Sequence, residues 1–200
     1  KVCKELFPNV KIVVMKKGET WQFKHLIVPS MSNVRDGITT PALAPWLRHF
    51  KGLANIKGIK PHRKIVVLRP GAVTRRIQNS DELLLNLKGW ETVVLEKMSI
   101  REQIKTFAEA SHVVAAHGAG LTNLLWCQPG TKVLEINQKS EIHKKVYPLL
   151  SHNLNLEHKL YLADVVPIPK ENGKKPKGIK RFSDMIKFKI NIPEIMEHLE

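Results

Sequence analysis

From residue 64 to about residue 165, short apolar runs alternate with longer stretches in which apolar side chains recur at helical spacing. The apolar runs are residues 64–69, 92–95, 112–116 and 132–136. Strands that are apolar on both faces and separated by helices form parallel sheets with helices on both sides. The alternation therefore predicts a doubly wound, Rossmann-like α/β domain.

The stretches between these runs carry helix signals. Residues 79–88 place three leucines on one face, begin with Asn79 or Ser80 as the cap, and end before a glycine. Ser99 and Glu102 form the capping-box pattern that starts the next helix. Two further helices are expected over residues 118–126 and 143–151.

The flanking regions show weaker patterns. Residues 11–15 and 26–28 predict short strands, residues 41–55 a helix, and residues 185–190 and 193–199 a last strand and a terminal helix. We therefore expect four parts: 1–60, a remnant of an N-terminal or connecting segment; 61–165, the α/β domain; 166–181, a basic loop or linker; and 182–200, the C-terminal strand and helix.

Composition excludes several classes of protein. Hydrophobic residues make up 42% and charged residues 26%, which is ordinary for a globular chain and not for a disordered or fibrous one. No apolar run approaches the ~20 residues that span a bilayer. Cys3 and Cys127 cannot make a disulfide framework or a cysteine-based zinc site. The net charge of +15 indicates either a solvated lysine-rich surface or a polyanionic partner: nucleic acid, anionic membrane or a phosphorylated small molecule.

Residues 113–123 combine the end of a predicted strand, two glycines and the start of a predicted helix. Ligands of open α/β sheets bind at the carboxyl ends of strands, and a helix start presents unpaired N–H groups and partial positive charge. Gly118 and Gly120 let a phosphate approach the backbone with no Cβ atom in the way, and Thr122 and Asn123 add side-chain donors. The alternative is that the glycines only make a tight turn and let the helix pack close to the strand.

Residues 69–79 follow the first strand of the regular region and therefore belong to the same edge of the sheet. Arg69, Arg75 and Arg76 can meet phosphate oxygens through paired hydrogen bonds. The alternative is a solvated basic loop. Two anion-binding loops on one edge indicate a site more specifically than either loop alone.

Motifs for other chemistries are absent from the sequence. It contains no Asp-x-Asp pair of the kind that commonly holds Mg²⁺ or Mn²⁺ against a diphosphate, no P-loop pattern and no GxGxxG dinucleotide pattern. The histidines lack metal-ligand spacing, since His112 and His117 would project to opposite faces of their strand. We therefore expect no metal site and no cofactor.

Four separated blocks, in their order and spacing, resemble glycosyltransferase family 61. They are Arg69 with Arg75-Arg76-Ile77-x-Asn79, then Glu102-Gln103-Ile104, then His117 to Asn123 (HGAGLTN), and finally Pro129-Gly130-Thr131 with Val133-Leu134-Glu135-Ile136. The resemblance covers about residues 62–150. It implies the C-terminal, donor-binding half of a GT-B-type enzyme that inverts the sugar and uses a nucleotide sugar, with a UDP-sugar favoured.

The resemblance also implies a donor-binding set that agrees with the two loops: Arg69, Arg75, Arg76, Asn79, His117, Gly118, Ala119, Gly120, Leu121, Thr122, Asn123 and Glu135. Without a metal, the arginines and the amides of the glycine turn would meet the charge on the diphosphate.

Individual roles within this set differ. His117 is expected to donate to a phosphate or ribose oxygen. Glu135 either accepts from ribose hydroxyls or is a structural partner of His117 or a lysine, and Asn79 either binds the donor or only caps its helix. For the general base, Asp36 and His25 are the upstream candidates; otherwise the base lies outside this chain.

These features predict a hexosyl- or pentosyltransferase that passes a sugar, with inversion and without a metal, from a nucleotide sugar to a hydroxyl of a glycan or protein in polysaccharide or glycan synthesis. One alternative is a basic nucleic-acid-binding module, against which the lack of aromatic residues among the Lys/Arg runs argues. Another is a catalytically inactive transferase-like binding domain. The sequence does not determine the compartment. Two cysteines suit a reducing cytosol, but a Golgi or ER lumen is also compatible. The basic surface suits a protein that works beside an anionic membrane.

Overall fold

The computed structural model describes residues 9–27, 49, 51–52, 54–56, 58–72, 74–138, 146–169 and 186–199. A six-stranded sheet with the order β2-β1-β3-β4-β5-β6 forms its centre. The strands are β1 (Arg63–Val67), β2 (Glu91–Val93), β3 (Ala110–Ala116), β4 (Lys132–Gln138), β5 (Glu157–Pro167) and β6 (Ile186–Lys189). β1 to β5 run parallel, and β6 pairs antiparallel with β5.

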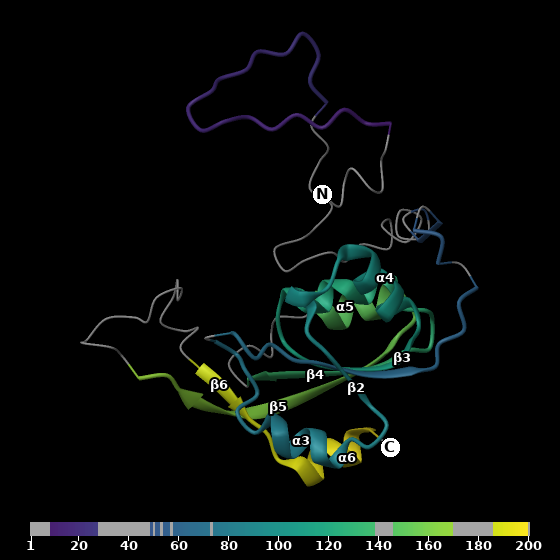
Figure 1. The fold of residues 1–200 in the computed structure, drawn as a ribbon, viewed down its shortest axis with the longest axis vertical. Coiled ribbons are helices and arrows are strands. Elements are labelled where there is room, and N and C mark those ends of the chain that lie inside the picture. The colour runs from purple at the N-terminus through teal and green to yellow at the C-terminus, as the bar shows by residue number, and fades with distance from the viewer. Residues whose placement is uncertain are drawn as a thin grey trace.

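Helices cover both faces of the sheet (Figure 1). One face carries α4 (Ile100–Ala108), α5 (Val146–Asn153) and the 3₁₀ helix η3 (Ala119–Trp126). The other face carries α3 (Ser80–Asn86) and α6 (Ile192–Leu199). A short 3₁₀ turn, η2 (Leu95–Lys97), precedes α4. This two-sided cover confirms the α/β class that the apolar strands predict.

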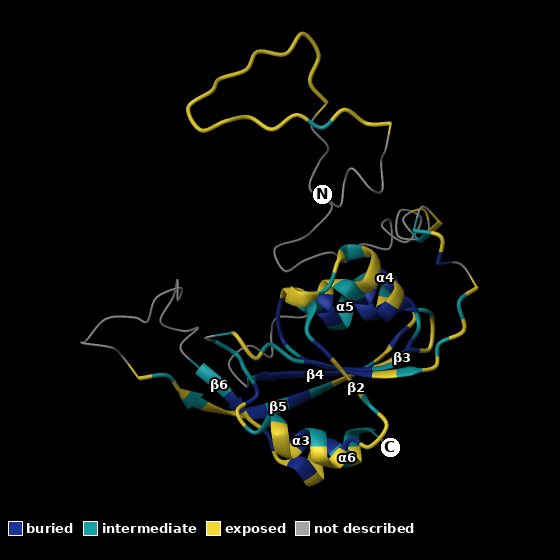
Figure 2. Ribbon diagram, viewed as in Figure 1, coloured by how far each residue is buried: buried dark blue, intermediate teal, exposed yellow. Residues whose placement is uncertain are grey.

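Each face of the sheet has its own apolar core. Along β3, Val113 and Ala115 belong to the core under α4 and α5, whereas Val114 belongs to the core over α3 and α6, as the two-residue period of a strand requires. Phe107 and Phe188, one in each core, are 0% exposed. Each such side chain stabilises the fold by about 1.5–3 kcal/mol. Figure 2 shows the central strands largely buried and the outer sides of the helices exposed.

The start of α4 shows how local sequence sets an element. The Ser99 hydroxyl accepts from the backbone N–H of Glu102 (3.2 Å), and the Glu102 carboxylate accepts from the backbone N–H of Ser99 (2.6 Å). These bonds satisfy two donors that a helix start leaves unpaired, which stabilises the helix by about 1 kcal/mol. The predicted capping box is therefore confirmed.

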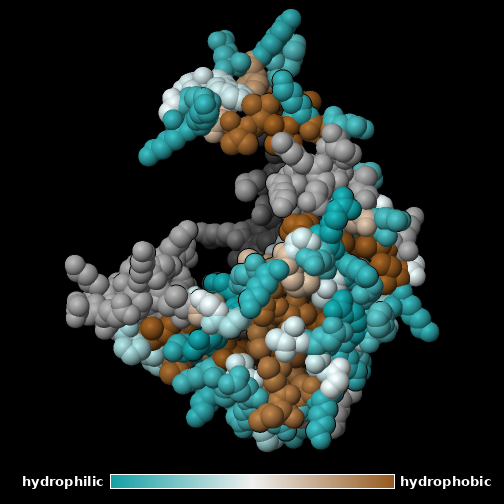
Figure 3. All heavy atoms as spheres, viewed as in Figure 1, coloured by the Kyte–Doolittle hydropathy of each residue, from teal (hydrophilic) through white to brown (hydrophobic). Residues whose placement is uncertain are grey.

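Two predicted strands near the N-terminus are wrong. Residues 11–15 and 26–27 lie in the stretch 9–27, which contains neither helix nor strand. An apolar run forms a strand only when a neighbouring strand pairs with its backbone, and within the described residues this stretch has none. Figure 3 shows its apolar side chains at the surface, and the exposed ones include Val13, Val14, Phe23, Leu26 and Ile27. Most of the predicted helix over 41–55, and residue 28, lie outside the described residues.

β5 is a strand that the sequence analysis does not predict. Its eleven residues include Glu157, Lys159 and Asp164, which interrupt the apolar pattern. The strand forms because β4 and β6 pair with it on its two sides. It runs through Pro167, into the segment expected to be a loop, whereas residues 170–185 lie outside the described residues. The predicted last strand and terminal helix are present as β6 and α6.

Candidate functional site

The chain changes its direction across the sheet between β1 and β3. From β1 it passes through α3 to β2 on one side, and from β2 it returns through α4 to β3 on the other side of β1. The loops that leave the carboxyl ends of β1 and β3 therefore turn toward opposite faces, and a crevice opens between them. This topological switch point is where ligands of open α/β sheets bind.

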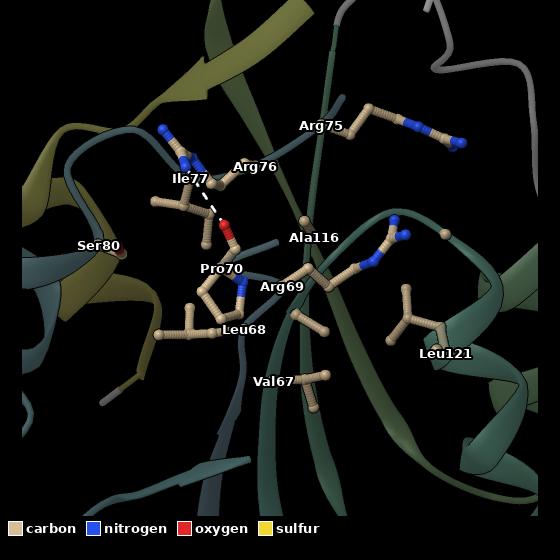
Figure 4. Close-up of a pocket in the computed structure, with 13 residues that line it drawn as sticks. Val67, Leu68, Arg69, Pro70, Arg75, Arg76, Ile77, Ser80, Ala116 and Leu121 are labelled. Atoms are coloured by element: carbon tan, nitrogen blue, oxygen red, sulfur yellow. Dashed lines mark hydrogen bonds between the residues drawn. The ribbon is translucent and has the colours of Figure 1, made fainter. Parts of the chain in front are cut away.

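A cavity of about 50 Å³ occupies this position. Both loops singled out in the sequence line it (Figure 4). The lining residues are Val67, Leu68, Arg69, Pro70, Arg75, Arg76, Ile77, Ser80, Ala115, Ala116, Gly118, Gly120 and Leu121. The structure thus brings the three arginines and the two glycines to one cavity, as their shared edge of the sheet predicts.

Arg69 and Arg76 make few contacts with other polar groups. The Nε atom of Arg69 lies 3.2 Å from Glu96 Oε1, with 40% and 56% of the two side chains exposed. A Cβ atom added to Gly118 would lie 3.9 Å from Arg69 Nη1, so this guanidinium group lies beside the glycine turn. Arg76 Nη1 donates to the carbonyl of Pro70 (3.3 Å). In Figure 4, Arg69 and Arg75 extend to the same side of the cavity, whereas the Arg76 guanidinium turns the other way.

Arg75 is held in an unusual conformation. Its φ of 53° lies in the left-handed region, which costs a non-glycine residue roughly 1 kcal/mol. Its backbone N–H donates to Ile186 (2.7 Å), and its Nη1 donates to the carbonyl of His117 (3.5 Å). Its buried Nε has no hydrogen-bond partner within the described part of the chain. A buried unpaired donor costs about 1–3 kcal/mol, so Arg75 Nε would be stabilised by an acceptor that the described residues do not supply.

The glycine turn leads from β3 into η3. The earliest bond within η3 runs from the N–H of Leu121 to the carbonyl of Gly118 (3.0 Å), so the N–H groups before Leu121 have no partner inside this helix. A Cβ atom on Gly120 would lie 3.0 Å from Leu95 Cδ1, whereas one on Gly118 would meet only the Arg69 side chain at 3.9 Å. Gly120 therefore serves close packing, and Gly118 leaves the backbone open toward Arg69.

His117 does not line the cavity, although it precedes Gly118. Its Nδ1 bonds to Glu135 Oε1, and its ring meets the Tyr147 ring edge-on with 5.2 Å between the centroids. Glu135 Oε2 lies 3.0 Å from His158 Nε2, and His158 Nδ1 lies 2.8 Å from the Ser151 hydroxyl. Burial raises the pKa of Glu135, but the hydrogen bonds and the electrostatic attraction of His117 and His158 together outweigh burial and hold the pKa below its usual value.

Glu135 is therefore a structural partner of His117, and its contact with a ribose stays a prediction. β4 continues to Gln138, so Glu135 lies inside the strand and not at its end, next to Ala115 of β3. Its side chain is 1% exposed. The sequence left both roles open because nothing in it indicates that His158 approaches the same carboxylate.

Asn79 stands at the N-cap position of α3, but its side chain makes no capping bond. Its amide instead donates to the carbonyl of Ile190 (2.9 Å) and accepts from the N–H of Ile190 (3.1 Å). It also donates to Glu82 (3.0 Å). The predicted start of the helix is thus confirmed, but the predicted side-chain cap is wrong, because the link between β6 and α6 offers a complete backbone pair. Asn79 is not among the residues that line the cavity.

The last three predicted site residues, Ala119, Thr122 and Asn123, lie on η3 outside the lining of the cavity. Asn123 donates to Gln103 (3.1 Å) and to the carbonyl of Gly120 (3.2 Å), so its amide braces the turn. Thr122 is exposed and bonds to Tyr147, whose pKa is raised by burial. Ala119 is exposed. None of these three residues lines the cavity.

The remaining predictions concern the general base, a metal site and a membrane span. His25 is exposed in the irregular stretch 9–27 and does not line the cavity, and Asp36 lies outside the described residues. The described part of the chain holds no group of three or more His, Cys, Asp or Glu side chains that could bind a metal ion. None of the described helices has the length and apolar character needed to cross a membrane. Burial raises the pKa of the Cys127 thiol to about 12.

Residues 3–134 match the family Glycosyltransferase 61. The chain belongs to glycosyltransferase family 61. The resemblance inferred from the four sequence blocks is thereby confirmed, and the family match contains both loops of the cavity.

Two relatives carry related names. Beta-1,2-xylosyltransferase RCN11 from Oryza sativa subsp. japonica is 31% identical over an alignment of 156 residues that covers 72% of this chain and 27% of the relative. Beta-1,2-xylosyltransferase from Arabidopsis thaliana is 28% identical over 110 residues, which are 47% of this chain and 20% of the relative. The family 61 chain thus spans about a quarter of the length of these relatives.

Proposed function

We propose that the cavity at the switch point binds the diphosphate of a nucleotide sugar, and that the chain is the donor-binding part of a glycosyltransferase. The sugar passes with inversion to a hydroxyl group of a glycan or protein. The observation that carries the proposal is that Arg69, Arg75 and the glycine turn meet at one cavity. Family membership supports glycosyl transfer, and the names of the two relatives favour a xylosyl donor.

The reaction breaks the bond between the anomeric carbon and a diphosphate oxygen, and the diphosphate leaves with the electron pair. Fixed hydrogen-bond donors stabilise this developing charge because they need no rearrangement when it appears. Arg75 supplies a buried Nε without a partner in the described residues, and Arg69 reaches over Gly118. We propose that these guanidinium groups supply the positive charge without a divalent cation.

The size of the cavity restricts what it holds. Sites for whole cofactors are about 300–1,000 Å³, whereas this cavity is about 50 Å³. It therefore suits the diphosphate alone. The nucleoside and the sugar lie on surfaces beyond it, which agrees with a match that covers only 27% and 20% of the two relatives.

A thermal-shift experiment with UDP, GDP and CDP tests the proposal. A nucleotide at ~100 times its Kd stabilises the chain by about 2.7 kcal/mol, which raises the Tm of a domain of this size by roughly 5–10 °C. We expect UDP to give the largest rise, with equal values in EDTA and in added Mn²⁺. Melting curves that stay unmoved by all three nucleotides would refute a donor site in this chain.

Matched variants locate the binding. Arg76→Met removes a guanidinium group from the cavity lining whose hydrogen bond goes to a backbone carbonyl. Lys97→Met removes an exposed positive charge near the same edge but outside the lining. We expect the first variant to reduce the Tm rise and the second to retain it. Equal reductions would indicate that general positive charge, and not the cavity, attracts the nucleotide.

A further inference from the structure

A row of polar side chains crosses four neighbouring strands at the amino edge of the sheet, where the parallel strands begin. Lys64 of β1 lies opposite His112 of β3. His112 lies opposite Lys132 of β4, and Lys132 lies opposite Glu157 of β5. Two residues along β3, Val114 belongs to the core over α3 and α6. Because side chains two apart on a strand share a face, the row lies on the face that α6 covers (Figure 1).

A second cavity, of about 100 Å³, occupies this end of the face. Three members of the row line it, His112, Lys132 and Glu157, together with Lys159 of β5 and His198 of α6. No residue that lines it also lines the cavity at the switch point. Since a water molecule needs roughly 10–15 Å³, this cavity has room for a group of several heavy atoms.

Positive charge at this cavity is only partly neutralised. Lys64, Lys132 and Lys159 share one carboxylate, Glu157, and the end of α6, which carries about half a negative charge. Roughly one and a half positive charges therefore remain. Like charges on neighbouring strands repel, and neither Lys64 nor Lys132 forms an ion pair with the described residues. The pKa of His112 reflects this repulsion, because burial lowers it and the charges of Lys64 and Lys132 lower it further.

Uncharged partners hold two of the three lysines in place. Lys159 Nζ donates to the carbonyl of His198 (2.9 Å). Lys64 Nζ lies 6.0 Å from the centroid of the Trp90 ring, which meets His112 edge-on with 5.7 Å between the centroids. These contacts position the ammonium groups and leave them their charge. An anion that binds here therefore loses less affinity to the ordering of side chains.

We propose that the cavity at the amino edge binds a phosphate group and is a site separate from the donor cavity at the switch point. A phosphate group carries about 1.5–2 negative charges at pH 7, which matches the positive charge that remains. Lysines bind phosphate as point charges, whereas a planar carboxylate suits the fork of an arginine. Here the lysines come from β1, β4 and β5. A free phosphate ion and the phosphate group of a larger molecule share this chemistry.

The NMR signals of the His112 and His198 rings test the proposal on the whole chain. Inorganic phosphate replaces chloride at constant ionic strength and about pH 7.5, where phosphate is mostly a dianion. We expect saturable shifts at both rings and none at His152, which is exposed on α5. Acetate at the same ionic strength should give weaker shifts. Equal shifts with acetate and phosphate, or none with phosphate, overturn the proposal.

Matched lysine variants test the location of the charge. Lys132→Met removes an ammonium group from the lining, and we expect phosphate to bind about tenfold more weakly. Lys97→Met removes an exposed lysine outside both cavities and should leave the affinity unchanged. The free energy of unfolding of Lys132→Met should stay constant or rise, since Lys132 is exposed and lies among like charges. Equal losses of affinity in both variants would indicate attraction by general charge and overturn the site.

Arg75→Met separates this site from the cavity at the switch point. The His112 signal should respond to phosphate in this variant as it does in the wild type. A response that disappears with Arg75 would assign the phosphate to the switch point and overturn the second site. If UDP fails to bind while phosphate still shifts His112, the proposed function fails and this inference stands.

A small phosphate monoester, glycerol phosphate, distinguishes the two sources of the phosphate group. Tighter binding of glycerol phosphate than of inorganic phosphate supports the site and identifies a larger phosphorylated molecule as its ligand. Tighter binding of inorganic phosphate supports the site and identifies the free ion. If neither compound shifts His112 and His198, the cavity is not a phosphate site.

Discussion

Arg63 and Arg75 lie at opposite edges of the parallel sheet and differ in their hydrogen-bond partners. At the amino edge, Arg63 donates twice to Glu91 (2.9 and 2.5 Å), once to Glu109 (3.2 Å) and once to Thr106 (3.2 Å). At the carboxyl edge, Arg75 keeps a buried Nε without a partner in the described residues. An arginine that is already neutralised stabilises the fold, whereas one that is not remains available to an external anion. The difference makes Arg63 a structural arginine, and it supports the proposal that Arg75 binds an anion.

Arg75→Met gives the largest expected effect. Loss of a charge-assisted hydrogen bond lowers the affinity for UDP by roughly tenfold to a hundredfold, or about 1.5–3 kcal/mol. The free energy of unfolding without nucleotide should stay constant or rise, since the variant removes a buried unpaired donor. Calorimetric titration with UDP and urea unfolding measure the two quantities. A variant that unfolds more easily and binds UDP normally would show that Arg75 is structural.

Arg63→Met tests the other edge. It leaves Glu109 and Thr106 without a donor that they share in the native fold. Because Glu109 is only partly buried and Glu91 is half exposed, we expect a loss of about 1–2 kcal/mol in the free energy of unfolding. UDP affinity should not change. If Arg63→Met weakened UDP binding as much as Arg75→Met, the contrast between the two edges would disappear.

The features that follow from local patterns could be predicted from the sequence. Apolar runs predict the sheet, Ser99 with Glu102 predicts a helix start, and strand ends place the arginine loop and the glycine turn on one edge. Hydrogen-bond partners could not be predicted, because distant segments supply them. The side-chain amide of Asn79 bonds to the backbone of Ile190 and therefore does not cap α3. His158, on the unpredicted strand β5, forms a second hydrogen bond with the Glu135 carboxylate.

Substitutions of the two glycines of the turn should have smaller effects, and the two sites should differ in whether stability or UDP affinity changes. Gly120→Ala brings a Cβ atom to 3.0 Å from Leu95 Cδ1, so Leu95 must move slightly, and we expect a loss of about 1 kcal/mol in the free energy of unfolding. Gly118→Ala meets only Arg69 at 3.9 Å and should leave stability within about 0.5 kcal/mol. Its effect should fall on UDP affinity, because the new methyl group stands where a phosphate approaches the backbone. Equal effects of both variants on affinity would assign the turn to packing alone.

The smallest expected effect is a change of the free energy of unfolding with pH, caused by Glu91 at the amino edge. The hydrogen bond from Arg63 lowers the pKa of Glu91, and the nearby charge of Arg63 adds to it. A carboxyl group whose pKa is lower in the folded than in the unfolded state stabilises the fold above its unfolded pKa, and this stability disappears as the pH falls through the folded value. Since Glu91 is half exposed, we expect less than about 1 kcal/mol.

Urea unfolding of the wild type and Glu91→Gln at neutral pH and at about pH 3, below the ordinary glutamate pKa, measures this difference. The variant should be less stable at neutral pH and should approach the wild type in acid, because Glu91 is then protonated and no longer pairs with Arg63 as an ion. High salt should narrow the gap at neutral pH. A gap of equal size at both pH values would mean that the side chains pack together without ionic pairing. Arg63 would then depend on Glu109 for its neutralisation, and the contrast with Arg75 would rest on that single carboxylate.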